Sequence, residues 1–280
     1  MNSKQYSRVY EPNLHLKLGM KIWIQMFAEL IQHRELIWRL FLRNLLATYQ
    51  QSLLGYLWIM ITPLVAIGTF VLLNRIGILN IGQTDVPYPL FALLGLTTWQ
   101  LLSTGIVAGS NSLTSAGALI SKINFPREVL IVATMAQTIF EFLIKFLFIL
   151  ILCGVFKYMP PPGIVYFPLA IVPIFILTIG LSLIFSLING IFRDTANILN
   201  LMMTFSLFLT PVLYPVPADK IYYFRLNPLT ALVNAPRDLL VYGHIQQPMD
   251  FLISTGISFL IFLLAWRVFH LVETKIPERL

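Results

Sequence analysis

The hydrophobic positions of this chain gather in long runs that few polar residues interrupt. A helix needs roughly 20 mostly apolar residues to cross the hydrocarbon core of a bilayer. Six stretches meet this requirement, at about residues 56–73, 89–113, 129–156, 163–192, 197–216 and 251–272. Apolar and polar positions do not alternate within them, as they would in the strands of a transmembrane barrel. The pattern predicts an all-α integral membrane protein with six transmembrane helices.

The composition agrees with this prediction and excludes a soluble enzyme. Of the 280 residues, 58% are hydrophobic and 11% are charged, whereas soluble domains average about 45–50% apolar and about 25% charged residues. Short connections between the six stretches favour a single transmembrane domain over residues 1–280. We expect a cytoplasmic or interfacial segment (1–54), a six-span bundle (55–272) and a cytoplasmic tail (273–280). The single cysteine, Cys153, forms no internal disulfide.

The positive charges predict the orientation of the bundle. Thirteen Lys and Arg residues fall in segments on the side of the termini, and five fall on the other side. Lys and Arg are enriched on the cytoplasmic side of membrane proteins, so both termini are expected in the cytoplasm. The net charge of +7 is then explained by topology, and no nucleic-acid partner is expected.

Residues 30–54, which precede the first span, have the pattern of an amphipathic helix. Polar residues that include Arg39 and Arg43 recur at helical spacing, and apolar residues cover much of the remaining surface. A basic helix of this kind lies among lipid headgroups. It is either a membrane-surface anchor alone or a lever or lateral gate for an amphipathic substrate.

The connection at residues 114–128 is expected to project from the cytoplasmic side as a short helix. Ser115 can cap this helix, which would end near Lys122, and Pro126 suits the first turn of the next span. Leu119 and Ile120 would then be presented on one face. The segment is either a docking site for a partner or an ordinary connector.

The longest outer connection, residues 217–250, is only partly polar. Asn227 can cap a helix that begins at Pro228, and Pro236 is expected to break this helix into two pieces too short to span a membrane. Apolar pieces of this length are typical of re-entrant or interfacial segments. The connection is either an external gate or a simple packed cap.

Two pairs of charges interrupt the apolar stretches. Glu141 and Lys145 lie four residues apart on one helix face, with the acid first, which suits an ion pair. The pair could be structural, facing the bundle or a dimer seam, could line a substrate path, or could couple transport to protons. Arg193 and Asp194, at a tight turn between two spans, suggest a structural latch.

Several motifs of catalysis are missing from the sequence. It contains no Gly-x-x-x-x-Gly-Lys-[Ser/Thr] phosphate loop, no Gly-x-Ser-x-Gly nucleophile motif and no histidines at metal-ligand spacing. We therefore expect no cofactor on this chain and an energy source on another subunit.

Four stretches together resemble the permease subunit of polysaccharide-exporting ABC transporters of the type-2 (ABC-2) class, which move O-antigen, capsule or teichoic acid. They are residues 43–58 with Pro63, Leu-Ile-Ser-Lys-Ile-Asn-Phe-Pro-Arg at 119–127, Phe-Arg-Asp at 192–194 with Thr-Pro-Val-Leu-Tyr-Pro at 210–215, and Asn-Pro-Leu-Thr at 227–230 with Arg237. In this order they span about residues 30–270, which is nearly the whole chain.

The resemblance implies a homodimer in the plasma (inner) membrane of a bacterium, joined to two copies of a separate ABC ATPase, which would bind ATP and Mg²⁺. It implies a channel at the dimer seam for a lipid-linked polysaccharide, and an interface or gate helix that carries Arg39, Arg43 and Tyr49. The coupling loop to the ATPase would contain Ser115, Leu119, Ile120, Lys122, Phe125 and Arg127. Outer gate residues would be Pro211, Pro215, Asn227, Pro228 and Arg237. Possible channel aromatics are Trp58, Phe70, Trp99, Phe208 and Tyr214.

The resulting hypothesis is a permease subunit of an ATP-driven exporter of a lipid-linked polysaccharide, such as O-antigen. One alternative is an exporter of a drug or small lipid with the same architecture. Another is a membrane-embedded glycan-modifying enzyme, with a site in the outer connection built from Asp219, Arg225, Arg237, Asp238 and His244.

Overall fold

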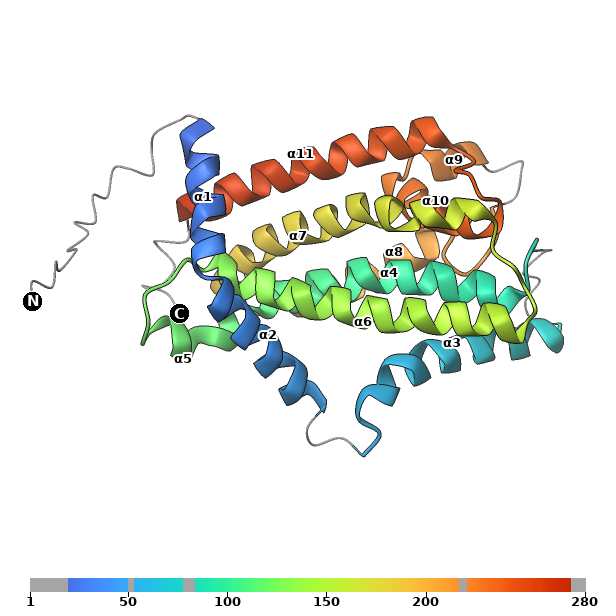
Figure 1. Ribbon diagram of the computed structural model, residues 1–280, viewed down its shortest axis with the longest axis horizontal. Coiled ribbons are helices and arrows are strands. Elements are labelled where there is room, and N and C mark those ends of the chain that lie inside the picture. The colour runs from blue at the N-terminus through green and yellow to red at the C-terminus, as the bar shows by residue number, and fades with distance from the viewer. Residues whose placement is uncertain (1–19, 50–52, 78–83, 217–220, 273–280) are drawn as a thin grey trace, which may run out of the picture.

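The computed structural model describes residues 20–49, 53–77, 84–216 and 221–272, and all regular structure within these residues is helical (Figure 1). The long helices are α3 (Trp58–Arg75), α4 (Tyr88–Asn111), α6 (Glu128–Val155), α7 (Phe167–Ile191), α8 (Thr195–Leu209) and α11 (Pro248–Val272). The shorter ones are α1 (Met20–Gln32), α2 (Arg34–Tyr49), α5 (Gly117–Ile120), α9 (Ile221–Arg225) and α10 (Pro228–Val241). Single 3₁₀ turns are η2 (Gly55–Leu57), η3 (Thr114–Ala116) and η4 (Pro162–Tyr166).

Five helical segments of the described residues are long and apolar enough to cross a membrane. They are α4, α6 and α11, together with α3 and α7, each extended by the 3₁₀ turn that precedes it. These five match five of the six predicted stretches. The predicted stretch 197–216 does not form one full-length helix, because α8 ends at Leu209. Thr210 is extended (φ −113°, ψ 135°), as expected for a residue that precedes a proline, here Pro211.

Helix α4 lies at the centre of the bundle and contacts α3, α6, α7, α8 and α10. In the most apolar stretch of α4, 78% of the residues are buried, compared with 17% for α3 and 22% for α11. Two glycines allow α7 to approach it closely: a Cβ on Gly105 would lie 2.5 Å from Thr178 Cγ2, and one on Gly109 would lie 2.4 Å from Ser182 Oγ. The Ser182 hydroxyl also donates to the carbonyl of Gly105 at 3.3 Å. Small residues that let backbones approach are the usual basis of helix association in membranes.

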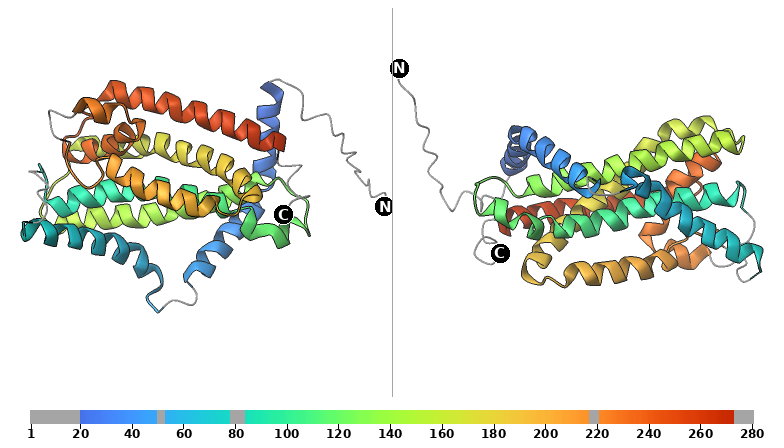
Figure 2. Two further views of the ribbon diagram at one scale, coloured as in Figure 1. Left: turned by 180° about the vertical axis from the view of Figure 1, so that it is seen from behind. Right: turned by 90° about the horizontal axis from the view of Figure 1, so that it is seen from below.

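The predicted amphipathic helix of residues 30–54 is two helices. The first, α1, begins at Met20, ahead of the predicted start, and the second, α2, ends at Tyr49. They meet at a turn at His33 and cross one end of the bundle (Figures 1 and 2). Helix α2 rests on α6 with Leu40, Phe41 and Leu45 buried, so packing of the apolar face sets its position. Residues 50–52 lie outside the described part of the chain.

The two connections singled out in the sequence lie at opposite ends of the bundle. Helix α5 is at the end where α1 and α2 cross, and α9 and α10 are at the other end (Figure 1). A buried cluster at the α5 end joins α1, the first turns of α6 and the end of α11. Its centre is Trp266, whose ring meets the edges of Trp23 and Phe27 at centroid distances of 5.5 and 4.7 Å. The larger core cluster surrounds α4 and extends to α10.

Candidate functional site

The connection at the α5 end forms a short projecting helix, but its exposed face differs from the prediction. Leu119 and Ile120 are half-buried against the cluster around Trp266, so they are not freely presented. The exposed positions at the end of α5 run from Ser121 to Asn124, and Ile123 among them has 51% of its surface accessible. The apolar side chains of α5 turn inward because the cluster beside them offers an apolar surface to cover.

The predicted cap of this helix is also different. The Ser115 hydroxyl donates to the carbonyl of Ser112 at 3.3 Å and makes no capping bond with α5. Ser115 and the other members of the predicted coupling loop line up along one projecting segment, with Phe125 and Arg127 half-buried at its base. Their role in coupling stays a prediction.

A buried carboxylate–imidazole pair lies directly behind this connection. His270 Nδ1 of α11 is 3.0 Å from Glu128 Oε1 at the start of α6, and the two side chains are 6% and 2% exposed. Glu128 Oε2 is also buried and has no hydrogen-bond partner among the described residues. The pair joins the first turn of α6 to the last turn of α11. Sequence reasoning missed it because the two residues are 142 positions apart.

The charged residues within the apolar stretches occupy different environments. Lys145 is 8% exposed in the interior of α6, and Glu141, one turn earlier, accepts a hydrogen bond from Gln137 Nε2 at 3.0 Å. A shared role of Glu141 and Lys145 stays a prediction. The side chains of Arg193 and Asp194 are exposed.

The turn that contains Arg193 and Asp194 is closed by a neighbouring residue. The Thr195 hydroxyl donates to the carbonyl of Phe192 at 2.6 Å. This hydrogen bond lies at the junction of α7 and α8. A latch role of Arg193 and Asp194 stays a prediction.

The five predicted channel aromatics do not share one environment. Trp58 and Phe208 are 49% and 58% exposed, and Phe70 is half-buried against the core. Trp99 is 3% exposed within the core, so it cannot line a channel at the surface of this subunit in this conformation. Tyr214 donates its hydroxyl to the carbonyl of Phe208 at 2.6 Å, which fixes the segment that follows α8.

At the opposite end, α10 is one continuous helix through Pro236, and the predicted break is absent. Ten of its residues are buried, and contacts with α4, α7 and α11 hold the helix together around the proline. The predicted cap is confirmed: Asn227 Oδ1 accepts the Leu229 N–H at 3.0 Å. Asn227 Nδ2 also donates to Thr210 Oγ1 at 3.1 Å, so the cap connects α10 to the end of α8.

Arg237 of α10 holds the segment between α8 and α9 in place. Its guanidinium, 5% exposed, donates to the carbonyls of Pro211 at 3.0 Å and Val212 at 2.6 Å. It lies 3.9 Å from the centre of the Phe91 ring, a cation–π contact. Burial lowers the pKa of Arg237 to about 10, so the group stays charged at neutral pH. A Cβ on Gly95 would lie 2.0 Å from Nη2, so the guanidinium fits only against glycine.

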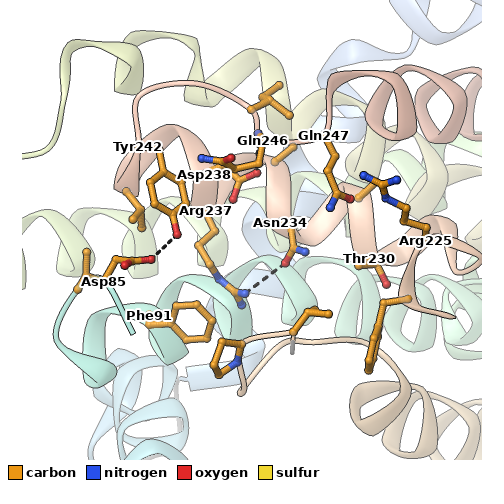
Figure 3. Close-up of a pocket in the computed structure, with 18 residues that line it drawn as sticks. Asp85, Phe91, Arg225, Thr230, Asn234, Arg237, Asp238, Tyr242, Gln246 and Gln247 are labelled. Carbon is orange, nitrogen blue, oxygen red and sulfur yellow. Dashed lines mark hydrogen bonds between the residues drawn. The ribbon is translucent and has the colours of Figure 1, made fainter. Parts of the chain in front are cut away.

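A cavity of about 540 Å³ opens beside Arg237, between α10, the segment after α8 and the loop after α10 (Figure 3). Burial raises the pKa of Asp238 to about 6, although the Gln246 N–H that it accepts acts in the opposite direction. Tyr242 donates its hydroxyl to Asp85 across the cavity. Burial and this hydrogen bond raise the pKa of Tyr242 to about 12.

This end of the bundle brings together most of the predicted outer gate residues. Arg237 touches Pro211 directly, Asn227 caps the helix that Pro228 begins, and Pro215 lines the cavity. Of the residues proposed for an enzyme site, Arg225, Arg237 and Asp238 line this cavity. Arg225 pairs there with Asp250 at 3.1 Å, and Asp219 lies outside the described residues. Among the described residues, no group of three or more His, Cys, Asp or Glu could hold a metal ion.

Comparison with known proteins identifies relatives along most of the chain. Residues 35–241 match the family described as ABC-2 type transporter. The chain is 26% identical over 261 residues to the O-antigen export system permease protein RfbA of Myxococcus xanthus, covering 91% of this chain and 98% of the relative. It is 27% identical over 221 residues to a protein of the same name from Klebsiella pneumoniae, covering 77% and 84%. It is 24% identical over 219 residues to the polysialic acid transport protein KpsM of Escherichia coli, covering 74% and 82%.

The matched region begins within α2, includes α3 to α9 and ends with α10, so it contains the projecting α5 connection, the central helix and the Arg237 site. The family match and the long apolar helices both indicate a multi-pass membrane protein. The chain therefore belongs to the ABC-2 type transporter family of membrane proteins.

Proposed function

We propose that this chain is the membrane-spanning subunit of an ATP-driven exporter that moves a lipid-linked polysaccharide across the inner membrane of a bacterium. The observation that carries the proposal is the match to a permease for O-antigen export over 98% of that permease's length. A second relative, named for transport of polysialic acid, also matches over most of its length. Both names specify a polysaccharide, which favours this substrate class over a drug or small lipid.

The proposed topology has six crossings, with α8 as the fifth. Helix α8 begins at the end of the bundle where α7 finishes, and the segment after it is held by Arg237 at the opposite end. Fifteen helical residues extend about 22 Å, and the turn after Leu209 would provide the remaining length. With six crossings, the surplus of Lys and Arg supports cytoplasmic termini and a cytoplasmic α5.

The proposed partners follow from the exposed surfaces at the α5 end of the bundle and along its sides. The exposed part of the α5 connection, with Lys122 and Ile123, would contact a separate ATPase subunit. The α3 helix is 17% buried within one subunit, and α8 exposes Phe205 and Phe208 at 70% and 58%. These apolar faces would meet lipid, a second copy of the chain and the lipid-linked substrate. The stoichiometry proposed is two permeases with two ATPases.

The outer end of the bundle would form the exit. Helix α10 and the segment from Thr210 to Pro215 make a compact cap that Arg237 and Asn227 fasten together. Because α10 is shorter than a membrane span, it would enter the outer leaflet from one side and act as a gate against the rest of the bundle.

Two measurements on intact cells and purified protein test this function. Cells that lack the chain should accumulate the polysaccharide in the cytoplasm, still attached to its lipid carrier. The purified chain should bring down a separate ATP-binding subunit and stimulate its ATP hydrolysis. A chain that modifies a glycan when purified alone, in cells that export their polysaccharide normally after its deletion, would overturn the proposal.

A further inference from the structure

The cavity beside Arg237 is lined by side chains whose hydrogen-bonding capacity the protein leaves unused. Three primary amides, those of Asn234, Gln246 and Gln247, reach it from α10 and the loop that follows (Figure 3). Asn234 Oδ1 accepts from Arg237 Nη1 at 3.2 Å. A guanidinium can only donate, so the Asn234 amide must direct its oxygen at Arg237, and its NH₂ group is left for another partner.

The formal charges around the cavity balance, and most of their hydrogen-bonding groups are occupied. Arg237 donates through Nη1 and Nη2 to backbone carbonyls, and Arg225 pairs with Asp250. Arg237 Nε has no partner among the described residues, but it is buried and therefore out of reach of a ligand. The lining carries two acids, Asp85 and Asp238, and the same two arginines, so their formal charges cancel. A site for a phosphate or another anion would instead present unpaired donors with positive charge. The lining therefore favours a ligand that is rich in hydroxyl groups over an anionic lipid headgroup.

The size and the aromatic part of the lining agree with this chemistry. About 540 Å³ lies within the range of roughly 300–1,000 Å³ that small-molecule sites occupy, which suits a short oligosaccharide and excludes a folded protein segment. Phe224 of α9 forms one wall and is half-buried. An aromatic face covers the C–H groups of a sugar ring, while amides both donate to and accept from its hydroxyls.

We propose that this cavity is a saccharide-binding site, which holds a short stretch of the exported polymer at the outer end of the subunit through Asn234, Gln246, Gln247 and the Phe224 ring. The inference rests on the proposed function for its ligand. The residues that line the site all belong to a single chain and come mainly from α4, α9, α10, the segment after α8 and the loop after α10. Bound sugar would contact the same helix that carries Arg237.

The probe is a set of short oligosaccharides released by partial acid hydrolysis from the polymer that accumulates in cells lacking the chain. Their binding to the complete permease–ATPase complex in lipid nanodiscs is measured by saturation-transfer NMR and calorimetry. The test variant is Gln246→Leu with Gln247→Leu, which removes two amides that make no side-chain hydrogen bond within the described residues. The control is Gln32→Leu, an exposed glutamine at the opposite end of the bundle.

We expect the oligosaccharides to bind the unchanged complex and the Gln32→Leu control equally. The double variant should bind about tenfold more weakly, because it loses the hydrogen bonds of two amides to the sugar. The melting temperature of the double variant should match that of the control. Glycerol 1-phosphate, a headgroup probe, should not compete.

Equal binding by the double variant, absence of binding by the unchanged complex, or displacement by glycerol 1-phosphate at similar concentration would each overturn the saccharide site. These results leave the proposed export function standing, provided that cells lacking the chain accumulate polymer. If no polymer accumulates in those cells, the export function fails and the inference fails with it. The two failures are therefore separated by the deletion strain.

Discussion

Replacing Gly95 by alanine should dislodge the guanidinium of Arg237. The added Cβ would lie 2.0 Å from Arg237 Nη2 and 2.2 Å from the carbonyl oxygen of Val212, which are distances that atoms cannot adopt without moving apart. The hydrogen bond between these two groups, 2.6 Å long, lies directly above the glycine. One methyl group therefore separates a buried charge from its acceptor.

The expected cost follows from the groups left without partners. A hydrogen bond from a charged donor contributes about 1.5–3 kcal/mol, and a buried polar group without a partner costs about 1–3 kcal/mol. Against this, alanine favours a helix over glycine by about 1 kcal/mol. The net loss should be about 2–5 kcal/mol, and it should also release the segment after α8 from α10.

The assay is thermal unfolding of the purified permease in detergent, followed by the loss of monodisperse protein in size-exclusion chromatography. Gly68→Ala in α3 is a matched control, because a Cβ on Gly68 meets nothing within 4 Å. Gly68→Ala should melt at or slightly above the temperature of the unchanged protein, and Gly95→Ala clearly below it. Equal melting temperatures for the two variants would refute the account of Arg237 as a clamp that needs glycine beneath it.

Three further predictions test the two ends of the bundle. Changing Lys122 to Glu and Ile123 to Asp should reduce recovery of the ATPase in affinity purification by at least about tenfold without lowering the melting temperature; undiminished recovery would place the contact elsewhere. Glu128→Leu removes the carboxylate that lies beside the buried His270. This single change should lower the melting temperature more than Glu128→Leu combined with His270→Phe. If the double variant is no more stable than the single variant, the two residues are not coupled. Burial raises the pKa of Asp238 from 3.8 to about 6, so the folded protein binds this proton more tightly than the unfolded chain, and stability should fall as pH rises from about 4 to about 6. Asp238→Asn should remove that fall, which amounts to roughly 3 kcal/mol, and parallel pH profiles for the two proteins would contradict it.

The sequence predicts the long helices well because length and hydropathy decide them. The starts and ends of α4 and α6 fall within one or two residues of the predicted runs. The predicted stretch 197–216 is longer than α8, because the apolar sequence continues past Leu209. The helix ends there because Thr210 precedes Pro211, which disfavours helical backbone angles at Thr210. Hydropathy alone does not reveal this steric effect of the proline.

The candidate site was predicted in part. The cap by Asn227 depends on neighbouring residues and could be recognised, whereas the break at Pro236 could not be judged, because helices distant in sequence stabilise α10 around it. The same limit applies to Leu119 and Ile120, whose inward orientation depends on a buried cluster that several helices build. The Glu128–His270 pair depends wholly on tertiary structure, and neither residue has a local pattern that predicts it.

The close contact of α4 with α7 makes the two helices a single stiff rod through the membrane. With Gly105 and Gly109 in contact with Thr178 and Ser182, neither helix can rotate or slide without steric overlap. A rod of 24 residues is about 36 Å long, and it leads from the α5 connection at one end to Gly95 and the Arg237 clamp near the other. An axial push at the α5 end would therefore arrive at the Arg237 end as a displacement of similar size.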